Sequence, residues 1–405
     1  MPPDTATSTT STTSTTSTTL EPAPTTLAGL FPAPIDATAD AAAAAETIAS
    51  RRPLLVRFGA MGDMVLMTTL VSALSARHGG CPVDILSSGS WTRPLLAGQP
   101  GVGDIYLLKN RSLPFLLSKD QRALVATLRE RGAGPVWYCD TDERCLRLLQ
   151  RAGFEPDQVC RAGNLPLRDG EHLVEYWQRF ARETPPAAAQ GANVAEIRCQ
   201  DPRLTVSPRE ADDVETWLAE RNLLGRQLLL VQPGNKRTMR RGLRRRPSNT
   251  KWWPETRWAA VLQSLAAMHP QAAILMLGVP QEHDLNEQII ALAGTRNTVN
   301  LACDLPIPRL VALQARASAM ISVDTGPAHS AAAVGCPVLV LFGVADPTRI
   351  VPRSTASPIR HLVGKDAKGA QSILGITVEQ VLAQWQDLPK RQTGVRPAGY
   401  IPACA

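Results

Sequence analysis

The feature that most constrains the fold of this 405-residue chain is a series of short apolar runs, each followed by a turn and then by a helical pattern. In the first half the runs cover residues 54–58, 83–86, 105–108 and 136–139. Strands that are buried on both faces are continuous apolar runs, and helices between them indicate crossover connections. The pattern therefore predicts a parallel, doubly wound α/β sheet.

A second series of apolar runs follows a Pro-, Ala- and Gln-rich stretch at 185–191. These runs cover residues 227–231, 273–277, 319–323 and 338–342, again with helical segments between them. They predict a second sheet of the same class. Two such units bind ligands in the cleft between them, at the carboxyl ends of the strands.

The composition of the ends and linkers sets the domain boundaries. Residues 1–50 hold repeated Ser-Thr-Thr triplets and then Pro- and Ala-rich sequence. Such a segment buries too little apolar surface to offset the entropy of ordering, so we expect a disordered tail. The rest is divided into an N-terminal domain at 51–207, a C-terminal domain at 208–375, a final helix at 376–390 and a loose tail at 391–405.

The sequence carries no sign of a membrane span, a secretion signal or a metal site. No apolar stretch approaches the ~18 uncharged residues that a spanning helix needs. The N-terminus lacks the basic and apolar regions of a signal peptide, and the eight cysteines show no metal-ligand spacing. We therefore expect a reduced, cytoplasmic protein and assign no metal ligands.

One segment holds an intense positive charge. The formal net charge is +7, and residues 236–251 contain eight basic residues and no acid, so the rest of the chain is close to neutral. The seven that precede Lys251 are Lys236, Arg237, Arg240, Arg241, Arg244, Arg245 and Arg246. Such a run is a solvated insertion, a nucleic-acid patch, or a site for anionic small molecules or lipid headgroups. The last fits best because the chain shows no other basic patch and no nucleic-acid-binding module.

The turn after the first apolar run contains Gly59, Gly62 and Asp63. Its two glycines allow a tight turn and a close approach of the backbone to a ligand. Asp63 then lies at the start of a helix, facing the cleft. It is either an N-cap, which this position favours by itself, or a functional carboxylate.

A second turn begins at Asp324 and joins the apolar run at 319–323 to an Ala-rich helix. The helix N-terminus offers unpaired N–H groups and the positive end of the helix dipole, with the Thr325 hydroxyl and the Gly326 amide beside it. His329 lies in the same motif. The turn has the outline of a diphosphate site, and the alternative is that Asp324 and Thr325 only cap the helix.

Two further positions suit contacts to a nucleotide. Lys251 precedes a Trp-Trp-Pro-Glu sequence that starts a helix, from which it could reach a phosphate in the cleft. Glu282, Asp284 and Glu287 follow the apolar run at 273–277, and an acid at such a strand end often accepts hydrogen bonds from ribose hydroxyls. The alternative for each acid is a solvated surface side chain.

Together these motifs resemble glycosyltransferase family 9, the ADP-heptose:lipopolysaccharide heptosyltransferases, over roughly residues 53–385. The opening strand and Gly-Asp turn at 54–63, the Lys-Trp-Trp-Pro element at 251–254 and the Asp-Thr-Gly-Pro-Ala-His sequence at 324–329 are similar to three motifs of that family. Leu-Phe-Gly and Asp-Pro at 341–347 extend the last match. Any one motif could arise by chance, whereas all three in this order and spacing are specific.

The resemblance implies a GT-B fold, in which two Rossmann-like domains face each other across a cleft and the last helix returns to the N-terminal domain. It implies inverting, metal-independent transfer of a heptose from ADP-heptose to a lipopolysaccharide core acceptor, with no cofactor. Asp63 would be the general base and Lys251 a phosphate contact. The residues that would bind the donor or form its site are Gly59, Gly62, Glu282, Asp324, Thr325, Gly326 and His329.

The implied partners are a nucleotide-sugar donor and an anionic glycolipid acceptor, and no nucleic acid is expected. We expect the basic insertion to bind phosphorylated or Kdo-type acceptor sugars, or the anionic inner leaflet, which would bring the protein to the membrane periphery. Two other functions stay open. One is a non-catalytic protein that binds nucleotide-sugars or nucleic acid on the same scaffold, and the other is a nucleotide-sugar epimerase, which would turn over the donor without an acceptor.

Overall fold

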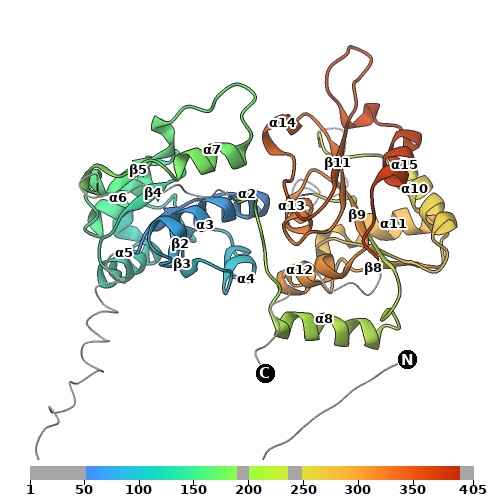
Figure 1. The fold of residues 1–405 in the computed structure, drawn as a ribbon, viewed down its shortest axis with the longest axis horizontal. Helices are drawn as coiled ribbons and strands as arrows, with labels where there is room; N and C mark the ends of the chain where they lie inside the picture. Colours follow the sequence, from blue (N-terminus) through green and yellow to red (C-terminus); the bar gives the residue numbers. More distant parts are fainter. Residues whose placement is uncertain (1–51, 189–199, 236–248, 393–405) are drawn as a thin grey trace, which may run out of the picture. The chain divides into compact units, whose positions relative to one another are not determined.

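The computed structural model describes residues 52–188, 200–235 and 249–392, and the text below concerns these ranges (Figure 1). Within them, eleven strands form two separate parallel sheets with helices around them. Three segments with sequence predictions lie outside the described residues: the tail at 1–50, the basic run at 236–246, and residues 393–405 of the C-terminal tail.

The first sheet has the strand order β3-β2-β1-β4-β5. Its strands are β1 (Leu54–Val56), β2 (Val83–Ser87), β3 (Val102–Leu107), β4 (Val136–Tyr138) and β5 (Val159–Arg161). Its helices are α2 (Met61–Leu66), α3 (Thr68–Arg77), α4 (Thr92–Leu96), α5 (Lys119–Arg131), α6 (Glu143–Arg151) and α7 (Leu173–Phe180). All pairs are parallel, so the predicted doubly wound sheet is confirmed. The strand order reverses between β1 and β4, which places the turn after β1 at the switch point.

The second sheet has the order β11-β10-β9-β6-β7-β8, again all parallel. Its strands are β6 (Leu228–Gln232), β7 (Ala273–Met276), β8 (Thr298–Asn300), β9 (Ala319–Val323), β10 (Val338–Phe342) and β11 (Ile359–Val363). Its helices are α8 (Pro208–Glu220), α10 (Glu255–Met268), α11 (His283–Ala293), α12 (Ile307–Arg316), α13 (Gly326–Ala333), α14 (Pro347–Ile350) and α15 (Val378–Asp387). The switch point lies between β6 and β9, so the turn after β9 leaves the sheet there.

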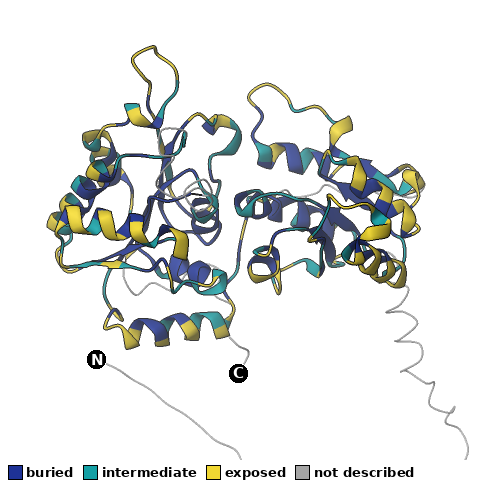
Figure 2. Ribbon diagram, turned by 180° about the vertical axis from the view of Figure 1, so that it is seen from behind, coloured by how far each residue is buried: buried dark blue, intermediate teal, exposed yellow. Residues whose placement is uncertain are grey.

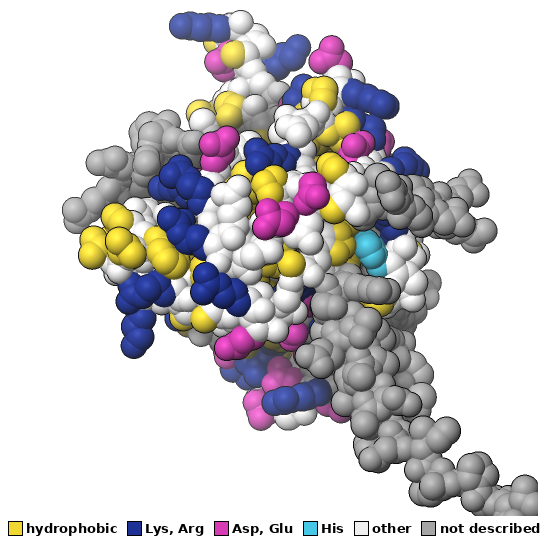
Figure 3. Space-filling model, turned by 90° about the vertical axis from the view of Figure 1, so that its left-hand side faces the viewer, with side chains coloured by type: hydrophobic (Ala, Val, Ile, Leu, Met, Phe, Trp, Pro, Cys, Tyr) yellow, Lys and Arg dark blue, Asp and Glu magenta, His cyan; other side chains and the backbone are white. Residues whose placement is uncertain are grey.

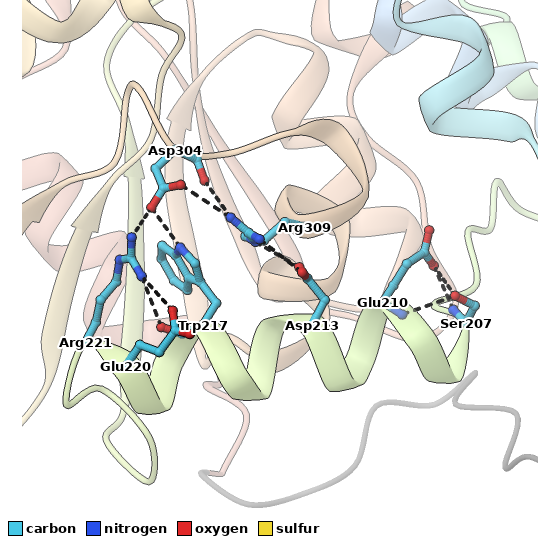
Figure 4. A network of polar contacts seen from close by, with 8 residues as sticks. All are labelled: Ser207, Glu210, Asp213, Trp217, Glu220, Arg221, Asp304 and Arg309. Carbon is cyan, nitrogen blue, oxygen red and sulfur yellow. Dashed lines mark hydrogen bonds and ion pairs between the residues drawn. The ribbon is translucent and has the colours of Figure 1, made fainter.

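Helix α8 precedes the second sheet in sequence and packs on α12 of that domain (Figure 4). The indole N–H of Trp217 donates to Oδ2 of Asp304 at 2.8 Å. Arg309, on α12, pairs with Asp213 at 2.8 Å and with Asp304 at 3.3 Å. The boundary between residues 207 and 208 stays a prediction, with one sheet formed before it and the other after it.

The last helix, α15, packs on α10 and β11 of the second sheet, so the predicted return of residues 376–390 to the N-terminal domain is wrong. Thr377 caps the helix through a capping box with Gln380. The apolar face of α15 then buries Val381 and Trp385 completely in the core of its own sheet. The start of the helix is held in place because the Trp253 indole donates to the Ile376 carbonyl at 3.0 Å.

Hydrophobic clusters fill the space between sheets and helices, with exposed residues on the outer sides of the helices (Figure 2). Within the described ranges, one cluster is continuous from one face of the first sheet, at Leu55, to one face of the second, at Leu230. Two further clusters fill the opposite faces, around Val56 in the first sheet and Val231 in the second. None of the described helices combines the length and apolarity needed to cross a membrane.

Candidate functional site

Two helix N-termini meet at the candidate site. Helix α2 follows β1, α13 follows β9, and the two helices pack against each other. A Cβ placed on Gly326 would lie 2.9 Å from the Cβ of Met61, and a Cβ on Gly62 would lie 2.8 Å from Cδ2 of His329. These glycines therefore allow the two helix ends to approach each other, and the His329 ring fills the space at Gly62 that we had assigned to a ligand.

Asp63 occupies the first turn of α2, one turn inside the N-cap residue, which is Ala60. Its Oδ2 accepts the backbone N–H of Ala60 at 2.7 Å, and its Oδ1 lies 3.8 Å from Nη2 of Arg57. A Cβ on Gly59 would lie 2.6 Å from the Cβ of Asp63, so glycine is needed where the carboxylate folds back over the turn. The Asp63 side chain is 34% exposed, which leaves part of the carboxylate open to solvent.

Lys251 and Asp324 form an ion pair across the second sheet's switch point. The Lys251 ammonium donates to the Asp324 carboxylate and, at 2.9 Å, to the Asp324 main-chain oxygen. The Asp324 side chain is 5% exposed and the Lys251 side chain is 34% exposed. The carboxylate is therefore buried, whereas the lysine remains partly accessible to solvent. Two of the three ammonium donors are used in these bonds.

The N-terminus of α13 carries no side-chain cap. Thr325 is the N-cap residue, its backbone is extended, and its side chain makes no capping bond. The Asp324 carboxylate is turned to Lys251. The structure therefore does not show the capping role that the sequence left open for these two residues. Pro327 has no N–H, and the Ala328 N–H donates to the Thr325 carbonyl at 3.0 Å. The Gly326 N–H is therefore the first-turn donor that remains for an anion.

His329 lies at the contact between the two helix ends, with its ring against Gly62. Its side chain is buried, and its Nδ1 has no hydrogen-bond partner among the described residues. Burial lowers the pKa of His329, the carboxylates of Asp324 and Asp63 raise it, and the Lys251 ammonium lowers it further. The pKa of this imidazole is thus affected by charged groups from both domains.

A cavity of about 420 Å³ lies beside the α13 N-terminus. Three of the predicted site residues line it: Glu282, Thr325 and Gly326. Asp63, Lys251, Asp324 and His329 lie outside this lining, on the helix-end contact next to it. The residues that sequence reasoning missed are Ser90, Trp91, Gln232, Asn235, Leu305, Ile307 and Leu310.

Glu282 is the buried acid of this cavity. It is 3% exposed, and burial raises its pKa to about 7, against the effect of hydrogen bonds from the Val279 N–H and the Gln232 amide. Asp284 and Glu287, the other candidates, have side chains that are 92% and 53% exposed. Of the three acids, Glu282 alone belongs to the cavity.

The cavity residues that were not predicted differ in how well the sequence pattern indicates them. Gln232 and Asn235 lie directly after the apolar run that became β6, so the strand-end rule that selected Glu282 would have selected them too. Trp91 follows β2 in a loop without a recognisable pattern. Among residues 52–188, 200–235 and 249–392, no three His, Cys, Asp or Glu side chains are grouped so that they could hold a metal ion.

Comparisons with known proteins agree with the motifs. A family model described as "Glycosyltransferase family 9 (heptosyltransferase)" matches residues 172–367. Lipopolysaccharide heptosyltransferase 2 of Salmonella typhimurium is 23% identical over 349 residues, which cover 81% of this chain and 95% of that protein. The relatedness therefore extends over both sheets.

Solved structures support the fold. The structure of E. coli ADP-heptose LPS heptosyltransferase II has a TM-score of 0.64 at 20% identity and covers 83% of this chain and 98% of its own. E. coli heptosyltransferase WaaC with ADP has a TM-score of 0.55 at 16% identity and covers 83% and 99%. The predicted GT-B arrangement of two parallel-sheet domains is confirmed. The resemblance to glycosyltransferase family 9 is thus confirmed by the family match over residues 172–367 and by relatives over most of the chain that are named heptosyltransferases.

Proposed function

We propose that the protein transfers a heptose, or a closely related sugar, from ADP-heptose to a lipopolysaccharide core or similar glycan, with inversion and without a metal ion. The observation that carries the proposal is the packing of α2 on α13, where the Asp63 turn approaches the turn whose Asp324 pairs with Lys251. It brings a carboxylate from one domain next to a cation and an uncapped helix end from the other.

The donor side of the proposal rests on charge and shape. A sugar diphosphate needs donors for its phosphate oxygens, and Lys251 and the Gly326 N–H at the start of α13 are suited to supply them. The adjacent cavity combines apolar walls at Leu305 and Ile307, suited to a nucleotide base, with Glu282, suited to ribose hydroxyls. ADP is chosen because a structural relative was solved with ADP.

The acceptor side rests on Asp63. Inversion needs a base on the face of the anomeric carbon opposite the leaving group, and a partly exposed carboxylate on α2 suits that position. A carboxylate is a weak base for an alcohol at rest, and it becomes effective only as the acceptor proton turns acidic late in the transition state. The diphosphate gains negative charge at the same time, and Lys251 and the α13 dipole offset it.

The proposal extends to the location of the reaction and to its acceptor. We place the reaction in the cytoplasm, and we keep the basic run at 236–246 as a contact for anionic groups of the acceptor, because the chain on its two sides, at Asn235 and Lys251, adjoins the site.

An activity screen tests this function. Full-length protein is incubated with ADP-, UDP- or GDP-linked sugars and a heptose-deficient lipopolysaccharide core, with and without a chelator. We expect release of ADP together with a mass shift of the acceptor by one heptose, an inverted anomeric linkage by NMR, and no loss of activity with the chelator.

Each other outcome of the activity screen would indicate a different function or mechanism. Release of nucleotide without a mass shift would contradict transfer, and conversion of the donor without any acceptor would indicate an epimerase. Loss of activity on chelation, restored by a divalent cation, would contradict the metal-independent mechanism.

A further inference from the structure

An apolar loop with a basic border lies on the first domain, outside the site described above. Residues 113–117 read Leu-Pro-Phe-Leu-Leu, and the side chains of Leu116 and Leu117 are 81% and 73% exposed. With Leu113, three of the nine large hydrophobic side chains exposed in the described ranges fall within these five residues. Exposed apolar side chains gathered in this way mark an interaction surface.

The loop is held in this conformation by its neighbours. Gln121 is buried, and its amide donates to the carbonyls of Asn110 at 3.0 Å and Leu113 at 2.9 Å. The Arg122 guanidinium donates to the Leu116 carbonyl. The side chains of Gln121 and Arg122 therefore fix the loop backbone in a conformation that exposes the leucines to solvent.

Arginines border the apolar tip. The loop and α6 enclose a cavity of about 240 Å³ whose lining includes Arg111, Arg144, Arg147 and Arg151. The Arg151 guanidinium lies 4.7 Å from the Phe115 ring centroid, so it stacks on the loop itself. On the side of the molecule that carries α5 and α6, hydrophobic side chains lie beside Lys and Arg side chains (Figure 3).

Few acids balance this charge. Asp142 pairs with Arg144 at 2.9 Å and with Arg111 at 3.9 Å, and Glu143 of α6 is exposed. Asp120 accepts the backbone N–H groups at the start of the loop. Arg147 makes no ion pair within the described ranges and is exposed. The border is therefore cationic around an apolar tip, which is the arrangement that binds acyl chains and phosphate headgroups together.

We infer that residues 109–122, with the arginines of α6, form a docking surface for an anionic lipid bilayer. The leucines enter the boundary between headgroups and acyl chains, and the arginines pair with lipid phosphates. Charge complementarity selects this partner, because an apolar tip ringed by cations matches a bilayer whose apolar interior lies beneath a layer of negative charge.

The surface is linked to the proposed catalytic edge. The loop follows β3 and α6 follows β4, at the carboxyl end of the sheet that also carries Asp63. The Arg111 guanidinium lies 4.6 Å from the ring centroid of Phe58, the residue before Gly59. Docking would thus bring the Asp63 edge toward an acceptor held in the bilayer. The delivery of Asp63 to an acceptor rests on the proposed function, whereas the binding of the surface to a bilayer does not.

Vesicle flotation of the full chain tests the inference. The vesicles are phosphatidylcholine alone or phosphatidylcholine with phosphatidylglycerol, and no donor or acceptor is added, so failure of the transfer reaction leaves the test intact. We expect binding to the anionic vesicles, and a loss of about tenfold or more in partition for Leu116→Ser/Leu117→Ser. The matched control is Leu224→Ser/Leu292→Ser, two exposed leucines of the second domain, which should bind as wild type.

A charge variant separates the two parts of the surface. Arg144→Gln/Arg147→Gln should lower binding several-fold at low salt and much less at high salt, because screening already weakens the same attraction. ADP binding and thermal melting of every variant check that the fold is intact. The inference is overturned if wild type does not float with anionic vesicles, or if the leucine variant floats as well as its control. It is likewise overturned if the leucine variant changes only the oligomeric state, which would indicate a protein partner.

Discussion

The turns after β1 and β9 are built from the same parts, yet they direct their carboxylates in different ways. Each turn leaves a central strand at the switch point of its sheet and opens a helix with an aspartate and a glycine nearby. Asp63 folds back onto the Ala60 N–H of its own turn. Asp324 turns away from its helix and pairs with Lys251.

The difference shows that the partner of one carboxylate determines whether the helix N-terminus beside it presents negative or positive charge. At α2 the acid accepts the N–H of the N-cap residue Ala60, lies 3.8 Å from the Arg57 guanidinium and remains partly exposed, so the turn presents a carboxylate oxygen. At α13 the acid is paired with a lysine and the helix start has no side-chain cap, so the Gly326 N–H and the positive end of the helix dipole attract an anion. Two similar turns thereby become complementary halves of one site.

Replacing Asp63 by Asn should give the largest effect. An Asn oxygen can still accept the Ala60 N–H, so α2 should keep its start, but the amide cannot take a proton. We expect the transfer rate to fall by about 10²–10⁴-fold while the Kd for ADP stays the same. Single-turnover assays and calorimetry measure the two quantities. Wild-type turnover in this variant would remove Asp63 as the base, and Asp63→Ala, which also loses the backbone bond, should be less stable by about 1 kcal/mol.

Removing the cation of the second turn should give the next largest effect. Lys251→Met leaves the buried Asp324 carboxylate without its partner, which should cost about 1–3 kcal/mol of unfolding free energy for this half-open pair. Transfer should fall by about 10²–10³-fold because the leaving diphosphate loses its cation. Denaturant unfolding and activity assays measure the changes.

A second substitution distinguishes stability from catalysis at this pair. Lys251→Met/Asp324→Asn removes the uncompensated charge, so it should recover most of the stability and none of the activity. Recovery of activity in the double variant would mean that Lys251 serves the fold alone.

The central strands of both sheets were predictable, and most edge strands were not. The apolar runs at 54–58 and 319–323 became β1 and β9, which are buried on every residue. The unpredicted strands β5, β8 and β11 lie at sheet edges and are only partly buried. An edge strand needs fewer apolar residues, so it leaves a weak pattern in the sequence.

For the site, sequence found the polar residues at strand ends and missed what tertiary packing decides. Asp63, Lys251, Asp324 and His329 are brought together, although no local pattern shows that His329 packs on Gly62 or that Lys251 pairs with Asp324. The course of α15 was missed for a related reason. Its amphipathic face indicates that it is buried, and only the neighbouring α10 determines where.

Glu282 is a third carboxylate near a helix start, and it forms no ion pair within residues 52–188, 200–235 and 249–392. Its pKa of about 7 lies above the ordinary value of 4.5, so between these pH values the unfolded chain releases the proton and the folded chain keeps it. The free energy of unfolding should therefore fall as the pH rises through this window, by on the order of 3 kcal/mol at most. Glu282→Gln should remove that slope and melt at a higher temperature than wild type at pH 8.

The comparison with wild type isolates this group, because the other carboxyls titrate in both proteins. Melting curves across pH 4 to 8 make the measurement. An unchanged difference between the two proteins at all pH values would mean that Glu282 ionises in the fold as easily as in the unfolded chain.

The smallest effects should come from the glycines that let the two turns meet, and they sharpen the comparison further. In Gly62→Ala the new Cβ contacts Cδ2 of His329, which belongs to a side chain. In Gly326→Ala the new Cβ contacts the Cβ of Met61 and also lies 3.2 Å from the backbone N of Gly62. Both should lose about 1–3 kcal/mol, with Gly326→Ala the worse because backbone gives way less easily than a side chain. Gly163→Ala, which meets nothing within 4 Å, is the control and should change stability by less than about 0.5 kcal/mol. If Gly62→Ala were the more costly variant, the His329 ring would have to be fixed as firmly as a backbone, and the neutral imidazole, rather than the helix ends, would be the element that holds the two turns together.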